Sequence, residues 1–417
     1  MTSVPPVDGK RLRTDIERNA SLGAVDADEG TGRTVIPGTT ANGRARSYLV
    51  ERMEDAGLKV AVDAVGNIAG TWRPPGEDGT TPPIAVGSHL EGGIFDGPLG
   101  VYAALESVRA IQASDAAVNR PVTVVCFTGE EGTRFADGVL GSSVAVGDLV
   151  VDDALTLSDG DVTLGDALDD IGFRGNGRLD ASEWDAWLEL HIEQRQTLER
   201  ADCPVGIVTS ITGTTRCLIT IGGESDHAGT TSMASRTDAL AAASELVLAI
   251  EADARESAGE DESAVATVGS LAASPNVVNV VPGGVELSVD IRSVDASTIE
   301  SLVEGVEEEL GSLERRRGVS TTFDRPYDVP PQPMAERIQR VLGDASTAVG
   351  VDAPSLYSGA GHDTMKVAKV TDAGMLFARS RGGYSHSPRE WTDWDDCTLS
   401  TQVLATALAD LVASEPE

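Results

Sequence analysis

The five histidines of this 417-residue chain lie in short polar or glycine-rich stretches rather than in plain amphipathic helices. The stretches are GSHLEGG, LELHIEQ, SDHAGTT, GAGHDTM and GYSHSPRE, around His89, His191, His227, His362 and His386. Most of them carry a carboxylate or carboxamide side chain close to the histidine. Imidazole nitrogen and carboxylate oxygen together suit divalent ions such as Zn²⁺, Mn²⁺, Co²⁺ or Ni²⁺. These contexts therefore indicate a metal site.

Two adjacent glutamates, Glu130 and Glu131, follow the apolar stretch PVTVVCFTG. Such a pair alone would be interpreted as surface charge. After an apolar strand and before Gly132, one carboxylate can bind a metal while the other stays free as a base. Two metals that share a bridging carboxylate and a water make that water acidic enough to attack a carbonyl carbon. The pair therefore favours metal-assisted hydrolysis.

Residues up to about 212 alternate helical patterns with short apolar strands, which predicts an α/β fold with a mainly parallel sheet covered on both faces. Strands are expected in PIAVGSHL, RPVTVVCF and WDAWLELHI, and helices in NGRARSYLVERMEDAG and LGVYAALESVRAIQA. Ligands of such sheets gather at the carboxyl ends of the strands. The three predicted strands lead into His89, the Glu130–Glu131 pair and His191.

Residues 216–324 show the order β-α-β-β-α-β, which is the split βαβ pattern of ferredoxin-like domains. Thr237 is a plausible N-cap for the first of the two helices. From about residue 330 the alternation of helix and strand returns. The predicted organisation is a metal-binding catalytic domain of residues 1–212 and 330–417, with a second domain of residues 213–329 inserted into it.

Seven stretches in chain order together resemble the amidase, hydantoinase/carbamoylase family: GSHL…GGIFDGPLGV, FTGEEGTRF, LHIEQ, SDHAGTTSM…R.DAL, PNVVNVVPGGVELSVDIR, SGAGHD and GGYSHSPRE. This family includes N-carbamoyl-L-amino acid hydrolases, β-ureidopropionase and allantoate amidohydrolase. It is a branch of the dinuclear-metal aminopeptidase and aminoacylase superfamily. The resemblance covers nearly the whole chain. It implies an exopeptidase-like catalytic domain and an inserted lid and dimerisation domain.

The resemblance also implies two divalent metal ions per subunit, which would be Zn²⁺, Mn²⁺, Co²⁺ or Ni²⁺. Asp96 would bridge the two ions. His89 and His191 would complete one metal site, and Glu131 and His386 would complete the other.

Five further residues receive roles from the same resemblance. Glu130 would be the general base that activates the water bridging the metals and later protonates the leaving nitrogen. His227 would polarise the scissile carbonyl in the active site of the partner subunit, which implies a homodimer. Gln194 would contact the ureido or amide group of the substrate. Asn279 and Arg292 would hold the substrate carboxylate, for which a guanidinium is well suited.

Four further residues are candidates for contacting and orienting these side chains without binding metal or substrate themselves: Glu91, Arg236, His362 and Asp363. The residue types also allow structural roles. Arg292 could form a surface ion pair, and Asn279 could cap a turn. His362 and Asp363 could order a loop.

The loop between His89 and Asp96 is several residues shorter than the family pattern. Members of the family usually carry an acid two residues after the first metal histidine, and this acid orients the histidine ring. Glu91 stands at that offset, but it matches the residue before the glycines when the loop is aligned from its other end. The shortening predicts an intact fold with weakened metal binding at the site that uses His89.

The composition is strongly acidic, with 67 Asp or Glu against 32 Lys or Arg and a formal net charge of −35 at pH 7. This charge argues against nucleic acid and anionic membrane as partners. Together with the scarcity of lysine, it predicts adaptation to a salt-rich cytoplasm, with an ordinary acidic bacterial enzyme as the alternative. The sequence starts without an apolar signal segment and contains no apolar run of membrane-spanning length, so we expect a cytoplasmic protein.

The predicted function is a metal-dependent hydrolase of carbon–nitrogen bonds other than peptide bonds, in linear amides or amidines. Its substrate would be an N-carbamoyl-L-amino acid or a related ureido acid such as allantoate. An aminoacylase or dipeptidase is one alternative, although GGIFDG and Gln194 favour the ureido branch. The other alternative is a catalytically impaired metal-binding relative, because of the short loop.

Overall fold

The computed structural model describes residues 4–77 and 79–414 and divides into two compact units. Within the described residues, unit 1 comprises the chain up to Thr209, the segment Met334–Leu356 and the chain from Gly361 onward. Unit 2 comprises Ser210–Pro333 and Tyr357–Ala360. No helix within these described ranges is both long and apolar enough to cross a bilayer.

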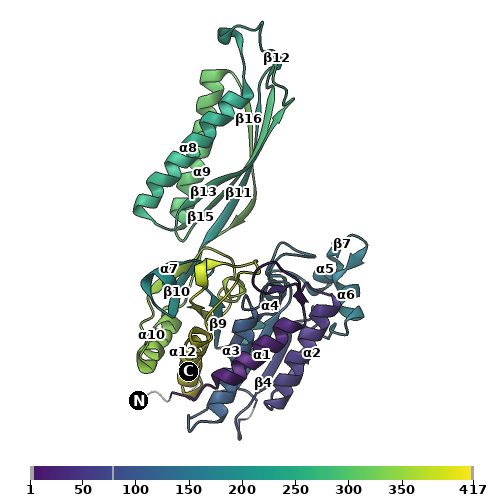
Figure 1. Cartoon of the computed structure of the whole chain (residues 1–417), viewed down its shortest axis with the longest axis vertical. Coiled ribbons are helices and arrows are strands. Elements are labelled where there is room, and N and C mark those ends of the chain that lie inside the picture. Colours follow the sequence, from purple (N-terminus) through teal and green to yellow (C-terminus); the bar gives the residue numbers. More distant parts are fainter. Residues whose placement is uncertain (1–3, 78, 415–417) are drawn as a thin grey trace. The chain divides into compact units, whose positions relative to one another are not determined.

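A mixed sheet with the order β10-β19-β9-β5-β6-β4-β3 forms the centre of unit 1 (Figure 1). Its strands are β3 (Lys59–Val62), β4 (Ile68–Trp72), β5 (Ile84–His89), β6 (Val122–Phe127), β9 (Ala186–Ile192), β10 (Val205–Ile211) and β19 (Asp372–Ala378). Short strands β17 (Gln332–Pro333) and β18 (Ser355–Ser358) also pair with β10. The predicted α/β class with a mixed sheet is confirmed. Along this order of seven strands, β19, β9, β5 and β6 pair in parallel, and β10, β4 and β3 pair antiparallel with their neighbours.

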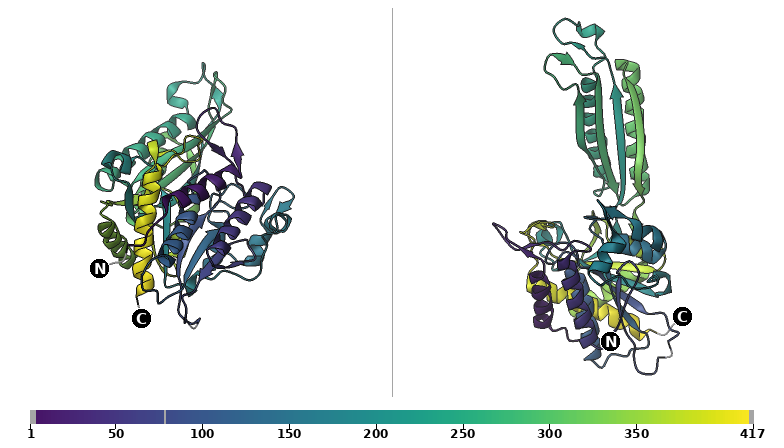
Figure 2. Two further views of the ribbon diagram at one scale, coloured as in Figure 1. Left: turned by 60° about the horizontal axis from the view of Figure 1, so that its bottom comes forward. Right: turned by 90° about the vertical axis from the view of Figure 1, so that its right-hand side faces the viewer.

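Successive residues of the central strands pack into two different cores, because side chains of a strand alternate between the faces of the sheet. Ile84 and Val86 belong to one core, and Ala85 belongs to another that also contains Trp187. Helices that contribute to the first core are α1 (Gly9–Ser21), α2 (Thr40–Asp55), α3 (Pro98–Gln112), α10 (Glu336–Val349) and α12 (Trp394–Ala413). Helices α4 (Leu140–Val146) and α11 (Thr364–Val367) contribute to the second. Figure 2 shows α12, in yellow, beside purple α1.

Smaller elements complete unit 1. An antiparallel pair of strands near the N-terminus has residue Ala24 opposite Arg33. The smaller elements are β1 (Ala24–Val25), β2 (Gly32–Arg33), α5 (Val151–Thr156), β7 (Ser158–Asp159), β8 (Val162–Thr163), α6 (Leu164–Asp170), α7 (Thr197–Ala201) and 3₁₀ turns at Ala181–Glu183 and Arg381–Gly383.

Unit 2 contains a four-stranded antiparallel sheet with the order β13-β15-β11-β16. The chain order is β11 (Gly213–Gly222), α8 (Ala239–Glu260), β13 (Val265–Ser274), β15 (Gly284–Ser293), α9 (Ala296–Arg317) and β16 (Ser320–Val329). Helices α8 and α9 pack side by side against the sheet, where they bury an apolar core (Figure 1). A small ribbon of β12 (Asp226–His227) and β14 (Val280–Val281) and a 3₁₀ turn at Met233–Ser235 complete the unit.

The N-cap predicted for α8 was wrong by one residue. Asp238, not Thr237, caps the helix, because its carboxylate accepts a hydrogen bond from the backbone N–H of Ala241. The carbonyl of Thr237 instead accepts a hydrogen bond from the N–H of Glu224.

Candidate metal centre and active site

The carboxyl ends of three neighbouring parallel strands carry the centre of the site. His89 is the last residue of β5, Glu130 and Glu131 follow β6, and His191 lies near the end of β9. Three groups of residues each present ligand atoms that all lie within 4.8 Å of one another. The groups are His89, Asp96 and His191; His89, Glu130 and Glu131; and Asp96, Glu131 and His386. The structure therefore brings together all five residues expected to bind metal and the expected base.

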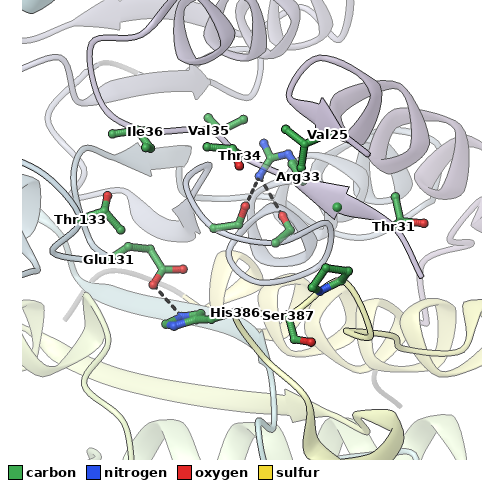
Figure 3. Close-up of a pocket in the computed structure, with 14 residues that line it drawn as sticks. Val25, Thr31, Arg33, Thr34, Val35, Ile36, Glu131, Thr133, His386 and Ser387 are labelled. Atoms are coloured by element: carbon green, nitrogen blue, oxygen red, sulfur yellow. Dashed lines mark hydrogen bonds and ion pairs between the residues drawn. The ribbon is translucent and has the colours of Figure 1, made fainter. Parts of the chain in front are cut away.

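Asp96 belongs to two of these groups and presents a different oxygen to each. Its Oδ1 lies 3.1 Å from Nε2 of His191 and 3.9 Å from Nε2 of His89. Its Oδ2 lies 3.6 Å from Nε2 of His386, which is 2.7 Å from Oε2 of Glu131 (Figure 3). This arrangement suits a carboxylate shared by two cations.

Three buried ligand atoms lack a well-formed hydrogen bond within the part of the chain that the structure describes. They are Nε2 of His89, Nε2 of His191 and Oε1 of Glu131. A buried polar atom whose hydrogen-bonding capacity is not filled is costly, and an ion or a water can fill it. Divalent cations would satisfy all three atoms, and nitrogen and carboxylate oxygen are suitable donors for them. The donor set therefore fits a metal centre.

Two residues at the site adopt the left-handed backbone region, which is uncommon without glycine. The φ angle is +58° at Gln194 and +52° at His386. Such a conformation costs roughly 1–3 kcal/mol and persists where the surroundings enforce it, often at functional sites. The Gln194 side chain donates from Nε2 to Oδ2 of Asp96 at 3.0 Å and to Oγ of Ser385 at 2.9 Å. The hydroxyl of Ser385 also donates to Asp96, so both loops orient the central carboxylate.

Glu130 has the electrostatic environment of a proton carrier. Burial, followed by the charges of Asp363 and Glu131, raises the pKa of the Glu130 carboxyl well above its usual value. Its Oε2 lies 3.5 Å from Nε2 of His89, so it is adjacent to the metal-binding groups. A carboxyl group with a raised pKa can accept and return a proton near neutral pH.

The apparent affinity for metal is expected to increase with pH. A hydrogen bond to Glu131 raises the pKa of His386 to about 9. Burial lowers the pKa of His191, but the charge of Asp96 outweighs it and raises that pKa to about 9. Both imidazoles are therefore protonated at neutral pH before metal binds and must release protons to coordinate it. Each displaced proton changes the affinity by up to about tenfold per pH unit below that pKa.

Calorimetric titration of Mn²⁺ into chelator-treated protein, in several buffers between about pH 6 and about pH 9, measures both the affinity and the protons released. An affinity that stays constant across this range would contradict the expected protonation of the two histidines.

The candidate supporting residues of unit 1 lie at different places around the centre. The buried ring of His362 lies 4.5 Å, between centroids, from that of His191. Asp363 is also buried and accepts a hydrogen bond from Oγ of Ser142 at 2.5 Å. Burial lowers the pKa of His362 well below its usual value, so this imidazole is neutral.

The side chain of Glu91 contacts residues of helix α2. Its Oε1 lies 3.4 Å from Nη2 of Arg46 and 3.4 Å from Nδ2 of Asn42, and all three side chains are buried. The loop thus directs this carboxylate to a buried guanidinium.

Three of the candidates in unit 2 belong to one loop region around the ribbon of β12 and β14. His227 is exposed, and its Nδ1 accepts a hydrogen bond from the N–H of Gly229 at 3.0 Å. The carbonyl of Asn279 accepts from the N–H of Ala228. Arg236 donates to the carbonyl of Ala228 and so supports the same turn.

Arg292 lies on β15 and is partly exposed. Its Nε and Nη2 donate to the two carboxylate oxygens of Asp290 at 2.7 and 3.3 Å, and its Nη1 donates to the carbonyl of Gly359 at 2.9 Å. The guanidinium is thus oriented by a neighbouring acid within unit 2.

A cavity of about 410 Å³ lies beside Glu131 and His386 (Figure 3). Its walls come largely from the N-terminal strands and from the glycine loop. The lining residues are Val25, Thr31, Gly32, Arg33, Thr34, Val35, Ile36, Gly92, Gly93, Glu131, Thr133, His386, Ser387 and Pro388.

Sequence reasoning missed three residues that contact this centre. Ser385 and Glu390 belong to the stretch GGYSHSPRE, so their proximity to His386 was an available signal. Arg33 had no such signal, because nothing in GTGRT indicates a contact with the distant glycine loop.

Comparisons with known proteins agree with this geometry. Residues 74–410 match the family model of peptidase family M20/M25/M40. An N-carbamoyl-L-amino-acid amidohydrolase of Paenarthrobacter aurescens is 37% identical over 395 residues, which cover 92% of this chain and 94% of the relative. An allantoate amidohydrolase of Bacillus subtilis (strain 168) is 35% identical over 367 residues, covering 86% and 88%.

Among solved structures, an amidase of the hydantoinase/carbamoylase family from Burkholderia multivorans matches with a TM-score of 0.90 and 29% identity, covering 99% of each chain. The chain belongs to peptidase family M20/M25/M40 and, within it, to the hydantoinase/carbamoylase amidases. The predicted resemblance and the predicted class of enzyme, a hydrolase of carbon–nitrogen bonds other than peptide bonds, are confirmed.

Proposed function

We propose that this metal-dependent amidohydrolase cleaves the ureido C–N bond of N-carbamoyl-L-amino acids. The observation that carries the proposal is Asp96, whose two oxygens face separate sets of histidine and glutamate ligands beside the buried carboxyl of Glu130. N-carbamoyl-L-amino-acid amidohydrolases among the relatives support this substrate class. The products would be the L-amino acid, carbon dioxide and ammonia.

Two divalent ions, when bound by the five ligands, would polarise the scissile carbonyl and make an attacking water more acidic. Glu130 removes a proton from that water and later delivers it to the leaving nitrogen. Gln194 holds Asp96 in place and orients the ureido group. Zn²⁺, Mn²⁺, Co²⁺ and Ni²⁺ all suit the ligand set.

We also propose that unit 2 serves as a lid and dimerisation domain of a homodimer. His227 of the partner subunit would polarise the carbonyl, and Asn279 and Arg292 would bind the substrate carboxylate. Cytoplasmic location and adaptation to salt stay predictions.

The experiment that tests the function measures ammonia release from a panel of substrates with added Mn²⁺ in concentrated KCl, which screens the large negative charge. The panel contains N-carbamoyl-L-amino acids, β-ureidopropionate, allantoate and an N-acetyl-L-amino acid, for which amino acid release is measured. We expect turnover of N-carbamoyl-L-amino acids that a chelator abolishes. Preferred turnover of the acetyl compound would indicate an aminoacylase, and no turnover by folded, metal-loaded protein would indicate an impaired relative.

Replacing Arg292 by alanine is expected to raise KM about 10- to 100-fold, because a charge-assisted pair of hydrogen bonds to the substrate carboxylate is lost. The value of kcat should change much less. Arg216→Ala is a matched control, since Nε of Arg216 lies 3.4 Å from the same Asp290 but on the neighbouring strand. Steady-state kinetics of both variants measure the difference, and an unchanged KM for Arg292→Ala would rule out the carboxylate role.

A further inference from the structure

The loop that carries Asp96 is bound through its carbonyl oxygens by a single arginine from β2. Nη1 of Arg33 donates to the carbonyls of Gly92 and Gly93 at 3.0 and 2.8 Å, and Nη2 donates to the carbonyl of Leu90 at 2.9 Å. Figure 3 shows this guanidinium with its two hydrogen bonds to the glycine carbonyls. A planar guanidinium can bind several oxygens at once, which an ammonium group does less well.

A carboxylate from the other end of the chain binds the same loop through its N–H groups. Oε1 of Glu390 accepts hydrogen bonds from the backbone N–H of Phe95 at 2.8 Å and of Asp96 at 3.1 Å. The loop is therefore held between a guanidinium group on its carbonyls and a carboxyl group on its N–H groups. One of the two N–H groups that donate to Glu390 is that of Asp96 itself.

The middle of the loop consists of two adjacent glycines, which supply no side chains to hold it. Gly92 has a φ of +90°, and a Cβ added there would lie 2.2 Å from Oε1 of Glu131. A Cβ at Gly93 would lie 2.1 Å from Oε2 of Glu390. A side chain at Gly92 would be strained, and one at Gly93 would displace the Glu390 carboxyl group. Glycine also loses more conformational freedom on ordering than any other residue. Hydrogen bonds from outside the loop help to offset that entropy, together with the buried side chains of Leu90, Ile94 and Phe95.

We propose that Arg33 and Glu390 are positioning residues that hold the loop between His89 and Asp96 and thereby place the Asp96 carboxylate at the metal centre. We then expect tight metal binding, in place of the weakened binding that the length of this loop predicts from the sequence. The inference rests on the proposed metal centre but not on the identity of the substrate.

The test measures Mn²⁺ binding to chelator-treated protein by calorimetry, and thermal unfolding of the same metal-free samples. The variants are Arg33→Met, Arg33→Lys and Glu390→Gln. Arg44→Met is the matched control, because Arg44 lies in the same region and its Nη2 donates to one carbonyl, that of Leu22, at 2.9 Å. We expect the affinity for Mn²⁺ to fall about 10- to 100-fold in Arg33→Met, as for other residues that support a metal ligand.

Arg33→Lys and Glu390→Gln should lose less affinity for Mn²⁺ than Arg33→Met, and Arg44→Met should lose none. Hydrogen exchange adds a readout that does not depend on metal: the amides of Phe95 and Asp96 should exchange faster in Arg33→Met and Glu390→Gln than in the control. If Arg33→Met does not fold, the other two variants decide the question. Wild-type affinity in the folded variants, with unchanged exchange of the two amides, would overturn the proposal. Wild-type turnover on the substrate panel tests the proposed function separately.

Discussion

Replacing Glu130 by glutamine is expected to lower kcat by about 10²- to 10⁴-fold, which is the usual contribution of a general base. Glutamine keeps the size of the side chain but cannot carry the proton between water and leaving nitrogen. The largely buried position and raised pKa of the Glu130 carboxyl fit this role. Because Glu130 is not one of the expected metal ligands, the variant should bind as much metal as the wild type.

The adjacent Glu131 supplies the matched comparison. Its Oε2 lies 2.7 Å from Nε2 of His386, so Glu131→Gln should weaken metal binding as well as turnover. Metal analysis by mass spectrometry and steady-state kinetics separate the two residues. If Glu130→Gln loses metal to the same extent, Glu130 is a ligand, which its contact with His89 also permits.

Replacing Asp96 by asparagine is expected to remove nearly all bound metal and to reduce turnover by more than about 10²-fold, since even an outer partner of a ligand contributes up to that much. The two oxygens of Asp96 face both groups of ligands, so a single substitution affects both metal sites. The same variant should lower the pKa of His191 from its value of about 9, because the charge that raises it is removed. NMR titration of the metal-free protein measures this change.

A suitable control is Asp148→Asn. Asp148 is partly exposed and pairs with Lys366 and Lys369 at 3.1 and 2.6 Å. The Asp148→Asn variant should keep the bound metal, the turnover and the His191 pKa of the wild type. An Asp96→Asn variant that binds metal like this control would show that Asp96 does not bridge the ions.

Much of the centre of unit 1 could be predicted from local sequence patterns. The apolar runs that end at His89, before Glu130 and at His191 do form the neighbouring strands β5, β6 and β9. Strands buried on both faces need apolar residues at nearly every position, so they are visible in the sequence without knowledge of their partners. The polar residues at the carboxyl ends of these strands then mark the edge of the sheet where ligands bind.

The antiparallel outer strands were harder to anticipate. Parallel pairing ends at β19 on one side and β6 on the other, and β10 and β4 pair antiparallel with them. Short strands at these positions have no sequence signal for direction, because direction depends on how the connecting segments return to the sheet.

The residue types and their order by themselves determined the family, the class of enzyme and the set of residues to examine, because each motif is a short stretch whose chemistry does not depend on distant contacts. Only the tertiary structure decided how the loop between His89 and Asp96 is held. Arg33 and Gly93 are 60 positions apart, and Glu390 and Phe95 are 295 positions apart. The position of a guanidinium or carboxylate relative to a distant backbone follows from the packing of the whole unit, which no local pattern records.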